Sequence, residues 1–401
     1  MDWKDRRAGA HFGPADASES LEELAELAAS AGAVVADRMI QSRAAPEAAT
    51  LIGHGKVQEL AQLAQSLDAG LVIFDHDLTP TQQRNLEKEL ACRVIDRTQL
   101  ILDIFAKRAR TREGRLQVEL AQLNYLLPRL TGRGIEMSRL GGGIGTRGPG
   151  ETQLETDRRR IHRRIKKIEE DLENVRAGRA LHRRKRQSVP LPTIALAGYT
   201  NAGKSTLFNR LAQAAVLADA RMFATLDPTV RPVTLPSRRR VLVSDTVGFI
   251  GNLPTTLVKA FRATLEEVTD ATLILHVVDV SAPHAAAQTG HVLKVLAEID
   301  VEAYRHRLLG GTGAASESHA VAISALTGNG IDRLLSAIDE VLPFDPIVRV
   351  RLRLPLGEAA RISMIHDLGR VLETRYVEDR CEMDVEIPES LRQRLSGFVD
   401  E

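Results

Sequence analysis

The residues best suited to chemistry form one short loop near the middle of this 401-residue chain. The phosphate-binding pattern G-x-x-x-x-G-K-[ST] is matched by Gly198, Tyr199, Thr200, Asn201, Ala202, Gly203, Lys204 and Ser205. In such a loop, successive backbone N–H groups surround phosphate oxygens. The lysine reaches the β- and γ-phosphates, and the serine hydroxyl binds magnesium. The loop therefore predicts a site for a nucleoside triphosphate with Mg²⁺.

The residues on either side of the loop predict the elements that must position it. Residues 193–197 form a short, mostly apolar run, as in a buried strand, and residues 206–211 have the composition of a helix. A helix that starts at the loop adds the partial positive charge of its N-terminus to the phosphate site. Strand, loop and helix together make a chance match improbable.

A second segment indicates which class of nucleotidase this is. Residues 239–245 predict a strand that ends in Asp245, and Thr246, Val247 and Gly248 follow it. An aspartate at the end of a neighbouring strand can hold magnesium through a water, and the glycine N–H can contact the γ-phosphate. The sequence D-T-V-G is typical of switch II in GTPases.

The second magnesium ligand should come from the segment between these two motifs. Phe223, Ala224, Thr225, Leu226 and Asp227 belong to a stretch with turn chemistry that continues to Thr229. Either threonine could supply the hydroxyl, and the residues alone leave both open. Phe249 occupies the position at which many GTPases carry the glutamine that orients water, so we expect slow intrinsic hydrolysis. The missing group would come from elsewhere in the chain, from the nucleotide and its ions, or from a partner.

The charge of the chain is concentrated in one region. The net charge is only +1, yet residues 158–186 hold 13 Lys or Arg and 4 acids. Apolar residues recur there at helical spacing, and residues 115–127 carry a second apolar stripe, so we predict an antiparallel helical hairpin with a Gly-rich tip at 132–150. The basic face is either a solvated surface or a contact with RNA phosphates. Without a base-reading motif, we expect recognition of folded RNA by shape and no recognition of a DNA sequence.

A weaker glycine pattern lies in the same tip. Residues 143–148 fit G-x-G-x-x-G, but no strand precedes them, so we interpret them as part of a tip and not as a dinucleotide site.

The overall prediction is an α/β chain built around a P-loop GTPase domain with a mostly parallel sheet and helices on both faces. We expect disorder in residues 1–20, a small α/β subdomain at 21–97, the hairpin at 98–188, the GTPase domain at 191–344 and a small α+β domain at 346–401. Predicted strands include residues 33–36 in the subdomain and 320–323 in the GTPase domain. Two distant cysteines and the lack of a signal peptide or an 18-residue apolar run favour a soluble monomer in the cytoplasm.

Several separate blocks resemble one family, the HflX translational GTPases. They are residues 96–105, 113–123, 145–152, 245–250 and 260–268, within a similarity that spans about residues 24–345. The resemblance implies binding of GTP and GDP by residues 198–205, 223–227, 245–248 and Ser324, Ala325 and Leu326. It implies magnesium ligation by Ser205 and Thr225, and catalytic roles for Lys204, Thr225 and Gly248.

The resemblance also implies a partner. Members bind the large ribosomal subunit, place the hairpin tip near the peptidyl-transferase centre and help to split stalled ribosomes, which stimulate hydrolysis. An ATP-dependent helicase activity has been ascribed to the N-terminal part of some members, and peripheral membrane attachment is an open alternative to a purely cytoplasmic location.

One departure from the family pattern concerns the base. The N-K-x-D tetrapeptide, whose aspartate pairs with guanine, does not occur in this sequence, and residues 304–318 form a polar stretch where it belongs. A site without this carboxylate loses much of its power to reject adenine. The alternative prediction is therefore a ribosome- or RNA-binding module that binds nucleotide weakly or without base selectivity.

Overall fold

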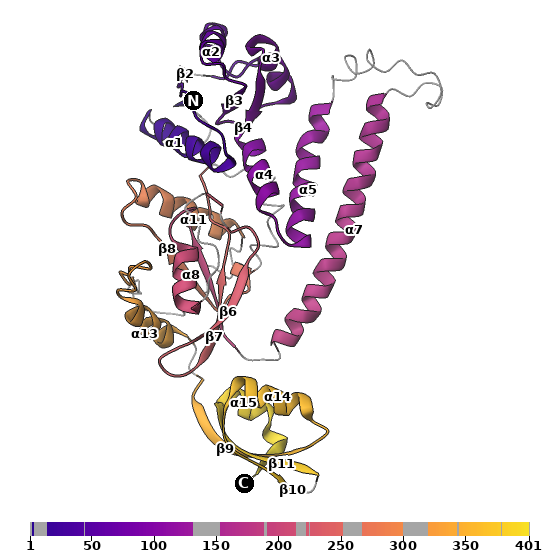
Figure 1. Cartoon of the computed structure of the whole chain (residues 1–401), viewed down its shortest axis with the longest axis vertical. Coiled ribbons are helices and arrows are strands. Elements are labelled where there is room, and N and C mark those ends of the chain that lie inside the picture. The colour runs from indigo at the N-terminus through magenta and orange to yellow at the C-terminus, as the bar shows by residue number, and fades with distance from the viewer. Residues whose placement is uncertain are drawn as a thin grey trace.

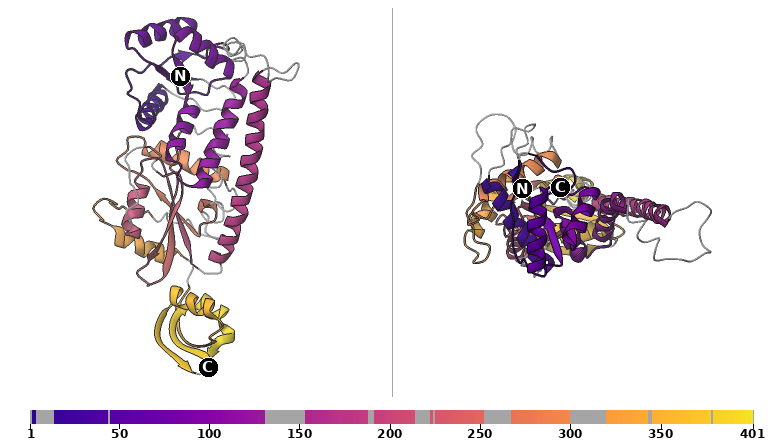
Figure 2. Two further views of the ribbon diagram at one scale, coloured as in Figure 1. Left: turned by 45° about the vertical axis from the view of Figure 1, so that its right-hand side comes forward. Right: turned by 90° about the horizontal axis from the view of Figure 1, so that it is seen from above.

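The chain folds into an N-terminal α/β layer, a pair of long helices, a nucleotide-binding domain and a C-terminal α+β domain (Figure 1). The computed structural model describes residues 2–3, 14–43, 45–130, 153–187, 191–213, 222–223, 225–251, 267–299, 320–342, 345–377 and 379–400. The N-terminal layer and the C-terminal domain lie at opposite ends of the nucleotide-binding domain, and the helical pair runs along one side (Figure 2).

The N-terminal layer is built from short strands and amphipathic helices. Its elements are β1 (Asp2–Trp3), α1 (Pro14–Ala31), β2 (Ser42–Arg43), α2 (His54–Ser66), β3 (Leu71–Phe74), α3 (Pro80–Leu90), β4 (Arg93–Asp96) and α4 (Arg97–Arg108). The strands β3 and β4 are parallel, and α2 and α3 bury Val57, Leu86 and Leu90 against them. Thr79 and Gln82 form a reciprocal capping box that fixes the start of α3.

Two expectations for this layer were wrong. The helix α1 begins at Pro14, so the predicted disorder of residues 1–20 does not hold for residues 14–20, where Ala17 is buried. Residues 33–36 form no strand, and the Val34 side chain is 94% exposed. A β-branched run becomes a strand only when a neighbour supplies a ladder of hydrogen bonds, and this segment pairs with no described strand.

The predicted antiparallel helical hairpin is confirmed. The helix α5 (Arg112–Leu126), followed by the 3-10 helix η1 (Leu127–Leu130), packs along α7 (Gln153–Gln187). The seam consists of Leu116, Leu120, Leu123, Ile168 and Leu172. Arg164 holds the Glu119 carboxylate through two hydrogen bonds of 2.6 and 2.7 Å. The Gly-rich tip, including residues 143–148, lies outside the described residues.

The nucleotide-binding domain surrounds a mixed sheet with the order β6-β7-β5-β8. Its elements are β5 (Thr193–Gly198), α8 (Lys204–Ala212), β6 (Thr229–Thr234), β7 (Arg240–Asp245), β8 (Leu273–Val277), α11 (Ala285–Ile299) and α13 (Ile331–Val341). The central strand β5 is parallel to both β7 and β8, and β6 is antiparallel to β7. The predicted class is therefore confirmed.

The predicted strand at residues 320–323 is absent from the sheet. These residues have no strand partner within the described chain, although Val321 and Ile323 still pack on the domain core. Apolar packing alone does not create a ladder.

The C-terminal domain has a hydrophobic core of its own. Its elements are β9 (Ile347–Pro355), α14 (Ala359–Leu368), β10 (Arg370–Val377), β11 (Arg380–Pro388), α15 (Glu389–Arg394), the 3-10 helix η2 (Ser396–Phe398) and β12 (Val399–Asp400). The strand order is β10-β11-β9-β12, so β9 is an interior strand. Its outward arginines pair across the sheet, Arg349 with Asp384 and Arg353 with Glu382.

In the described part of the chain, every helix is too short or too polar to span a membrane.

The hairpin seam leads to a first testable prediction. Ile168 is fully buried between the two helices, so Ile168→Ala should weaken their pairing by about 2 kcal/mol, near the lower limit for such truncations because the cluster is small. Amide hydrogen exchange along α5 and α7 measures this local stability. The matched control is Lys167→Ala, which alters an exposed neighbour on the same helix. Equal protection in the two variants would contradict the prediction.

Candidate nucleotide-binding site

The phosphate loop leaves the middle of the sheet and is shaped by its glycines. A Cβ at Gly198 would lie 2.4 Å from the Val277 carbonyl oxygen of β8, so only glycine allows this approach of the two strands. Gly203 has a φ of +87° and lies directly before α8, and Asn201 also has a positive φ of 61°. The chain therefore reverses tightly and begins a helix at Lys204, as the motif requires.

Lys204 is buried at the start of α8 and points back into the loop. Its Nζ donates a hydrogen bond of 2.6 Å to the Tyr199 carbonyl oxygen. Burial lowers the pKa of Lys204 to about 8, although the nearby Asp245 carboxylate acts in the opposite direction. A triphosphate would supply negative charge to this buried amine and favour its protonated form.

Three oxygen-bearing side chains converge beside the loop. The Ser205 and Thr225 hydroxyls each donate a hydrogen bond to Asp245 Oδ2, at 2.7 and 2.9 Å. The two hydroxyl oxygens are 3.0 Å apart. Asp245 Oδ1 is buried and has no hydrogen-bond partner among the described residues, and burial raises the pKa of this carboxyl. Hydroxyl and carboxylate oxygens are the donors that Mg²⁺ prefers, so these residues fit the ion.

This geometry distinguishes between the two candidate threonines. Thr225 contacts both Ser205 and Asp245. Thr229 is the first residue of β6 and lies opposite Asp245 in the antiparallel ladder. Of the two, the structure brings Thr225 to the predicted ligands.

Switch II is held against the phosphate loop by its backbone. The Phe249 carbonyl accepts from Thr200 N at 2.7 Å, and Phe249 N donates to the Gly198 carbonyl at 3.0 Å. A Cβ at Gly248 would be 2.7 Å from Thr200 Cα, so the two segments meet closely. The Thr200 hydroxyl is buried and has no partner in the described chain. Loop and switch thus form one wall of the site.

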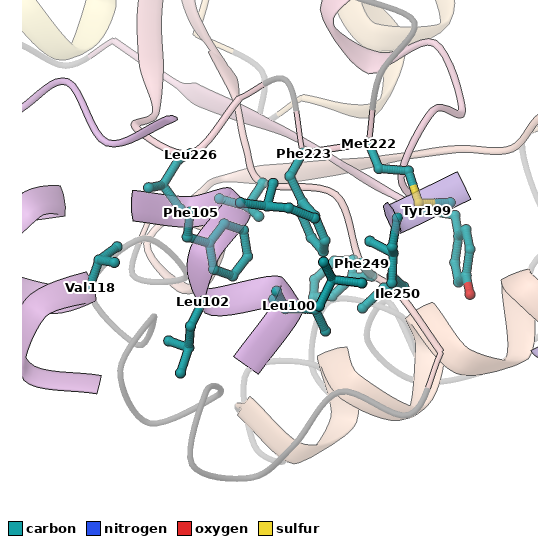
Figure 3. Close-up of a cluster of buried hydrophobic side chains, with 14 of the residues drawn as sticks. Leu100, Leu102, Phe105, Val118, Tyr199, Met222, Phe223, Leu226, Phe249 and Ile250 are labelled. Carbon is teal, nitrogen blue, oxygen red and sulfur yellow. The ribbon is translucent and has the colours of Figure 1, made fainter. Parts of the chain in front are cut away.

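Not every residue of switch II presents its side chain to a nucleotide. The Thr246 hydroxyl donates to the Leu196 carbonyl at 2.5 Å inside the sheet. Val247 and Phe249 are buried in the hydrophobic cluster that joins this domain to α4 (Figure 3). The predicted nucleotide contacts of Thr246 and Val247 therefore remain predictions for their backbone. The phenyl ring of Phe249 is withdrawn from solvent and has no group that could orient water.

A buried ionic network ties the loop to the N-terminal layer. The Tyr199 hydroxyl donates to Glu23 of α1 and accepts from Gly251 N at 2.6 Å. Arg97 pairs with Glu23, donates to Asp75 at 2.6 Å and contacts the Gly251 carbonyl at 3.1 Å. The network reaches the phosphate loop at Tyr199 and the residues after switch II at Gly251. Sequence reasoning missed Glu23 and Asp75, and it treated Arg97 only as part of a family block.

The segment around Thr225 (residues 222–223 and 225–229), called switch I below, also packs on the N-terminal layer. The Phe223 ring meets the Phe105 ring of α4 edge to face at 4.6 Å, and Leu226 is buried in the same cluster (Figure 3). The Asp227 carboxylate lies at the start of α5. These three side chains therefore contact the N-terminal helices or α5, and nucleotide contact through their backbone stays a prediction. Ala224 lies outside the described residues.

The loop expected to meet the base is held by an arginine that the sequence did not single out. Arg210 of α8 donates to the Ala325 carbonyl at 3.2 Å and to the Leu326 carbonyl. The Ser324 carbonyl accepts from Gly328 N at 2.8 Å, which closes the turn. The backbone N–H groups of Ala325 and Leu326 donate to no described residue, and the Leu326 side chain is 81% exposed. The turn is thus pre-shaped, with donors left for a ligand.

The lowered pKa of Lys204 makes triphosphate binding depend on pH. Below about pH 8 the amine is already charged in the empty site, so affinity should be flat there. Above that pH, binding must recapture a proton, and the dissociation constant should rise by up to about tenfold per pH unit until the pKa of the complex is reached. Fluorescent nucleotide titrations from about pH 7 to 9.5 measure this. Lys204→Ala should bind weakly with a flat profile, and the same slope in both proteins would exclude Lys204 as the cause.

The contacts of Arg210 predict a role in base recognition. The family resemblance implies that Ser324, Ala325 and Leu326 meet the base, and Arg210→Ala should release the turn that contains them. We expect GTP to dissociate about tenfold faster, since two hydrogen bonds from a charged donor are lost, and the ratio of GTP to ATP affinity to fall. Stopped-flow displacement provides both values. Arg333→Ala, at an exposed arginine of α13, is the matched control, and an unchanged ratio in Arg210→Ala would reject the role.

Comparisons with known proteins match nearly the whole chain. Family models described as GTP-binding GTPase N-terminal, GTP-binding GTPase Middle Region and 50S ribosome-binding GTPase match residues 18–106, 108–186 and 193–307. The curated GTPase HflX of Caldanaerobacter subterraneus subsp. tengcongensis is 46% identical over 387 residues, which cover 95% of this chain and 90% of that protein. GTPase HflX of Escherichia coli (strain K12) is 43% identical over 384 residues, covering 92% and 89%.

Among solved structures, a GTP-binding protein from Sulfolobus solfataricus in complex with GDP matches 80% of this chain and 95% of its own, with 23% identity and a TM-score of 0.42. The near-complete coverage and the identity of the curated relatives decide the family. The chain belongs to the HflX family of GTPases and is a GTP hydrolase.

Proposed function

We propose that this GTPase requires magnesium, binds the large ribosomal subunit and uses its nucleotide cycle to split stalled ribosomes. The observation that carries the proposal is the convergence of Ser205, Thr225 and Asp245 at one point. Thr225 belongs to switch I and Asp245 to the end of β7, so a complete triphosphate site needs both segments in place. A site assembled in this way can report the state of the nucleotide to other parts of the chain.

The residues of the chain have distinct tasks in hydrolysis. The loop N–H groups and Lys204 would bind the β- and γ-phosphates, and Gly248 N–H would contact the γ-phosphate from the switch II side. Ser205 and Thr225 would hold magnesium directly, with Asp245 behind them. A bound magnesium ion supplies neutralisation of the charge that develops on the phosphates.

The described site has no evident group that could orient the attacking water. Phe249 is buried and its backbone is fixed to the loop, so position 249 cannot provide it. The structure therefore supports slow hydrolysis by the isolated protein and stimulation by a partner that rearranges the switches.

The surface of the hairpin supports RNA as that partner. The first turns of α7 expose Arg158, Arg160, Arg163, Lys166 and Lys167 along one helix. Such a basic helix binds phosphate backbones by charge, with an affinity that falls steeply as salt increases. The matched family description, 50S ribosome-binding GTPase, names the same kind of partner. We propose a cytoplasmic monomer that contacts ribosomal RNA through this hairpin.

A second function remains supported by one observation, the absence of N-K-x-D. In this alternative, the chain is a ribosome-binding module whose nucleotide binding lacks selectivity for guanine. The two functions differ in whether GTP, and not ATP, alters the affinity for the subunit.

Hydrolysis rates with and without ribosomal subunits test the proposal. Large subunits should accelerate GTP hydrolysis by at least about tenfold, while small subunits should have little effect, because only a matched partner rearranges the switches. Light scattering of whole ribosomes should fall when GTP is added with the protein. Lys204→Ala should still bind subunits but abolish both effects. Fast hydrolysis that is indifferent to subunits, or subunit binding that is indifferent to GTP, would overturn the proposal, and the second result would favour the module.

A further inference from the structure

The Asp227 carboxylate of switch I lies on the N-terminus of α5, the first helix of the hairpin. Its Oδ2 accepts hydrogen bonds from Arg110 N at 2.9 Å and Thr111 N at 2.8 Å, and its Oδ1 accepts from the Thr111 hydroxyl. Thr111 is itself the N-cap of α5, since its hydroxyl accepts from Gly114 N at 2.9 Å. A carboxylate at a helix N-terminus is stabilised by the unpaired N–H groups and the helix dipole. Asp227 therefore caps a helix that lies 116 residues away in sequence.

The first turn of α5 is fitted to this carboxylate. A Cβ at Gly114 would lie 2.4 Å from Asp227 Oδ1. Glycine inside a helix costs about 1 kcal/mol relative to alanine, so its presence here reflects the space that Asp227 needs. The Asp227 carboxylate thus occupies a space that a side chain at position 114 would fill.

Two further contacts hold the same part of switch I. Met222 N donates to the Ser30 hydroxyl of α1 at 3.1 Å, and Phe223 packs on Phe105 of α4. Figure 3 shows Met222, Phe223 and Leu226 directed to the N-terminal helices. Asp227 adds hydrogen bonds to the hairpin, and Leu226 shares a hydrophobic cluster with Val118 and Ala121 of α5.

Thr225, which contacts Ser205 and Asp245, is two residues from Asp227. Two residues of chain span at most about 7 Å, so a shift of Asp227 cannot be absorbed before it reaches Thr225. We propose that Asp227 is a positioning residue: by holding switch I on the N-terminus of α5, it sets the Thr225 hydroxyl for magnesium binding and couples the hairpin to the nucleotide site. This inference rests on the proposed function, in which the hairpin meets the ribosome.

The coupling is reciprocal by thermodynamic necessity. If magnesium and triphosphate change how tightly Asp227 binds α5, then a partner that moves α5 changes the affinity of the site for magnesium and triphosphate by the same factor. A ribosome bound to the hairpin would in this way act on Thr225 without touching the nucleotide.

The test uses full-length variants that release the contact from either side. Asp227→Asn removes the charge, and Gly114→Ala displaces the carboxylate by its added methyl group. Both should raise the magnesium concentration for half-maximal GTPase activity by about tenfold, the loss expected for a charge-assisted hydrogen bond, while the KM for GTP at saturating magnesium changes little. Excess magnesium should restore most of the rate. A merely structural defect would lower the rate at every magnesium concentration.

The chain provides a matched control at another helix. Asp345 caps α15 in the C-terminal domain in the same manner, accepting from Ser390 N at 2.9 Å and from the Ser390 hydroxyl at 2.6 Å. Asp345→Asn removes an equivalent cap far from switch I and should leave the magnesium dependence unchanged. Equal magnesium dependence in Asp227→Asn and Asp345→Asn would overturn the inference.

Amide hydrogen exchange tests the coupling without ribosomes. In the unmodified protein, exchange at Arg110 and Thr111 should differ between the nucleotide-free state and the complex with magnesium and guanylyl imidodiphosphate, and this difference should vanish in Asp227→Asn. An exchange rate that ignores the nucleotide in the unmodified protein would refute the coupling. Failure of ribosomal stimulation alone, with this exchange difference intact, would reject the proposed function and leave the inference standing.

Discussion

A buried guanidinium holds the N-terminal layer, the phosphate loop and switch II together. The Arg97 side chain is 2% exposed and lies between the carboxylates of Glu23 and Asp75. Burial disfavours its charge, yet these two carboxylates raise its pKa above the ordinary value, so the group stays charged. Removal of one partner from such a pair leaves a buried charge and costs about 3–5 kcal/mol. These ion pairs lie within the N-terminal layer, and the contacts that tie it to the nucleotide site are the hydrogen bonds of Arg97 to the Gly251 carbonyl and of Tyr199 to Glu23.

Both switches use this layer as their support. Gly251, which follows switch II, lies between Arg97 and the Tyr199 hydroxyl, and switch I packs on α4 and caps α5. In many GTPases the switches are exposed to solvent and move freely, whereas here a movement of either switch would break its contacts with the N-terminal layer or with α5. This arrangement explains why a buried phenylalanine stands at position 249. Its side chain packs between the domains, and the attacking water would be oriented only after the switches rearrange.

The local part of this structure could be predicted from sequence, and the long-range part could not. The phosphate loop, its strand and helix, the hairpin seam and the capping of α3 depend on neighbouring residues, whose patterns are visible in the chain. The contact of Tyr199 with Glu23 spans 176 residues, and glutamate and tyrosine at those positions carry no pattern that links them. The segments 33–36 and 320–323 have strand-like composition, but a strand also needs a partner, and composition does not reveal whether one is present.

Because α7 is long, a small movement at the cap formed by Asp227 becomes a larger movement at the far end of the hairpin. Arg112 at the start of α5 lies beside Asp171 of α7, so residues 153–171 of α7 extend about 27 Å beyond the cap, and α5 packs along them to make one stiff arm. A tilt of about 5° at the base of this arm displaces its far end by about 2–3 Å, roughly half the rise of one helical turn. Small changes in hydrogen bonding at the base would thereby become displacements large enough to disturb a packed RNA surface. The hairpin is in this sense an amplifier, with its fulcrum beside the magnesium ligands.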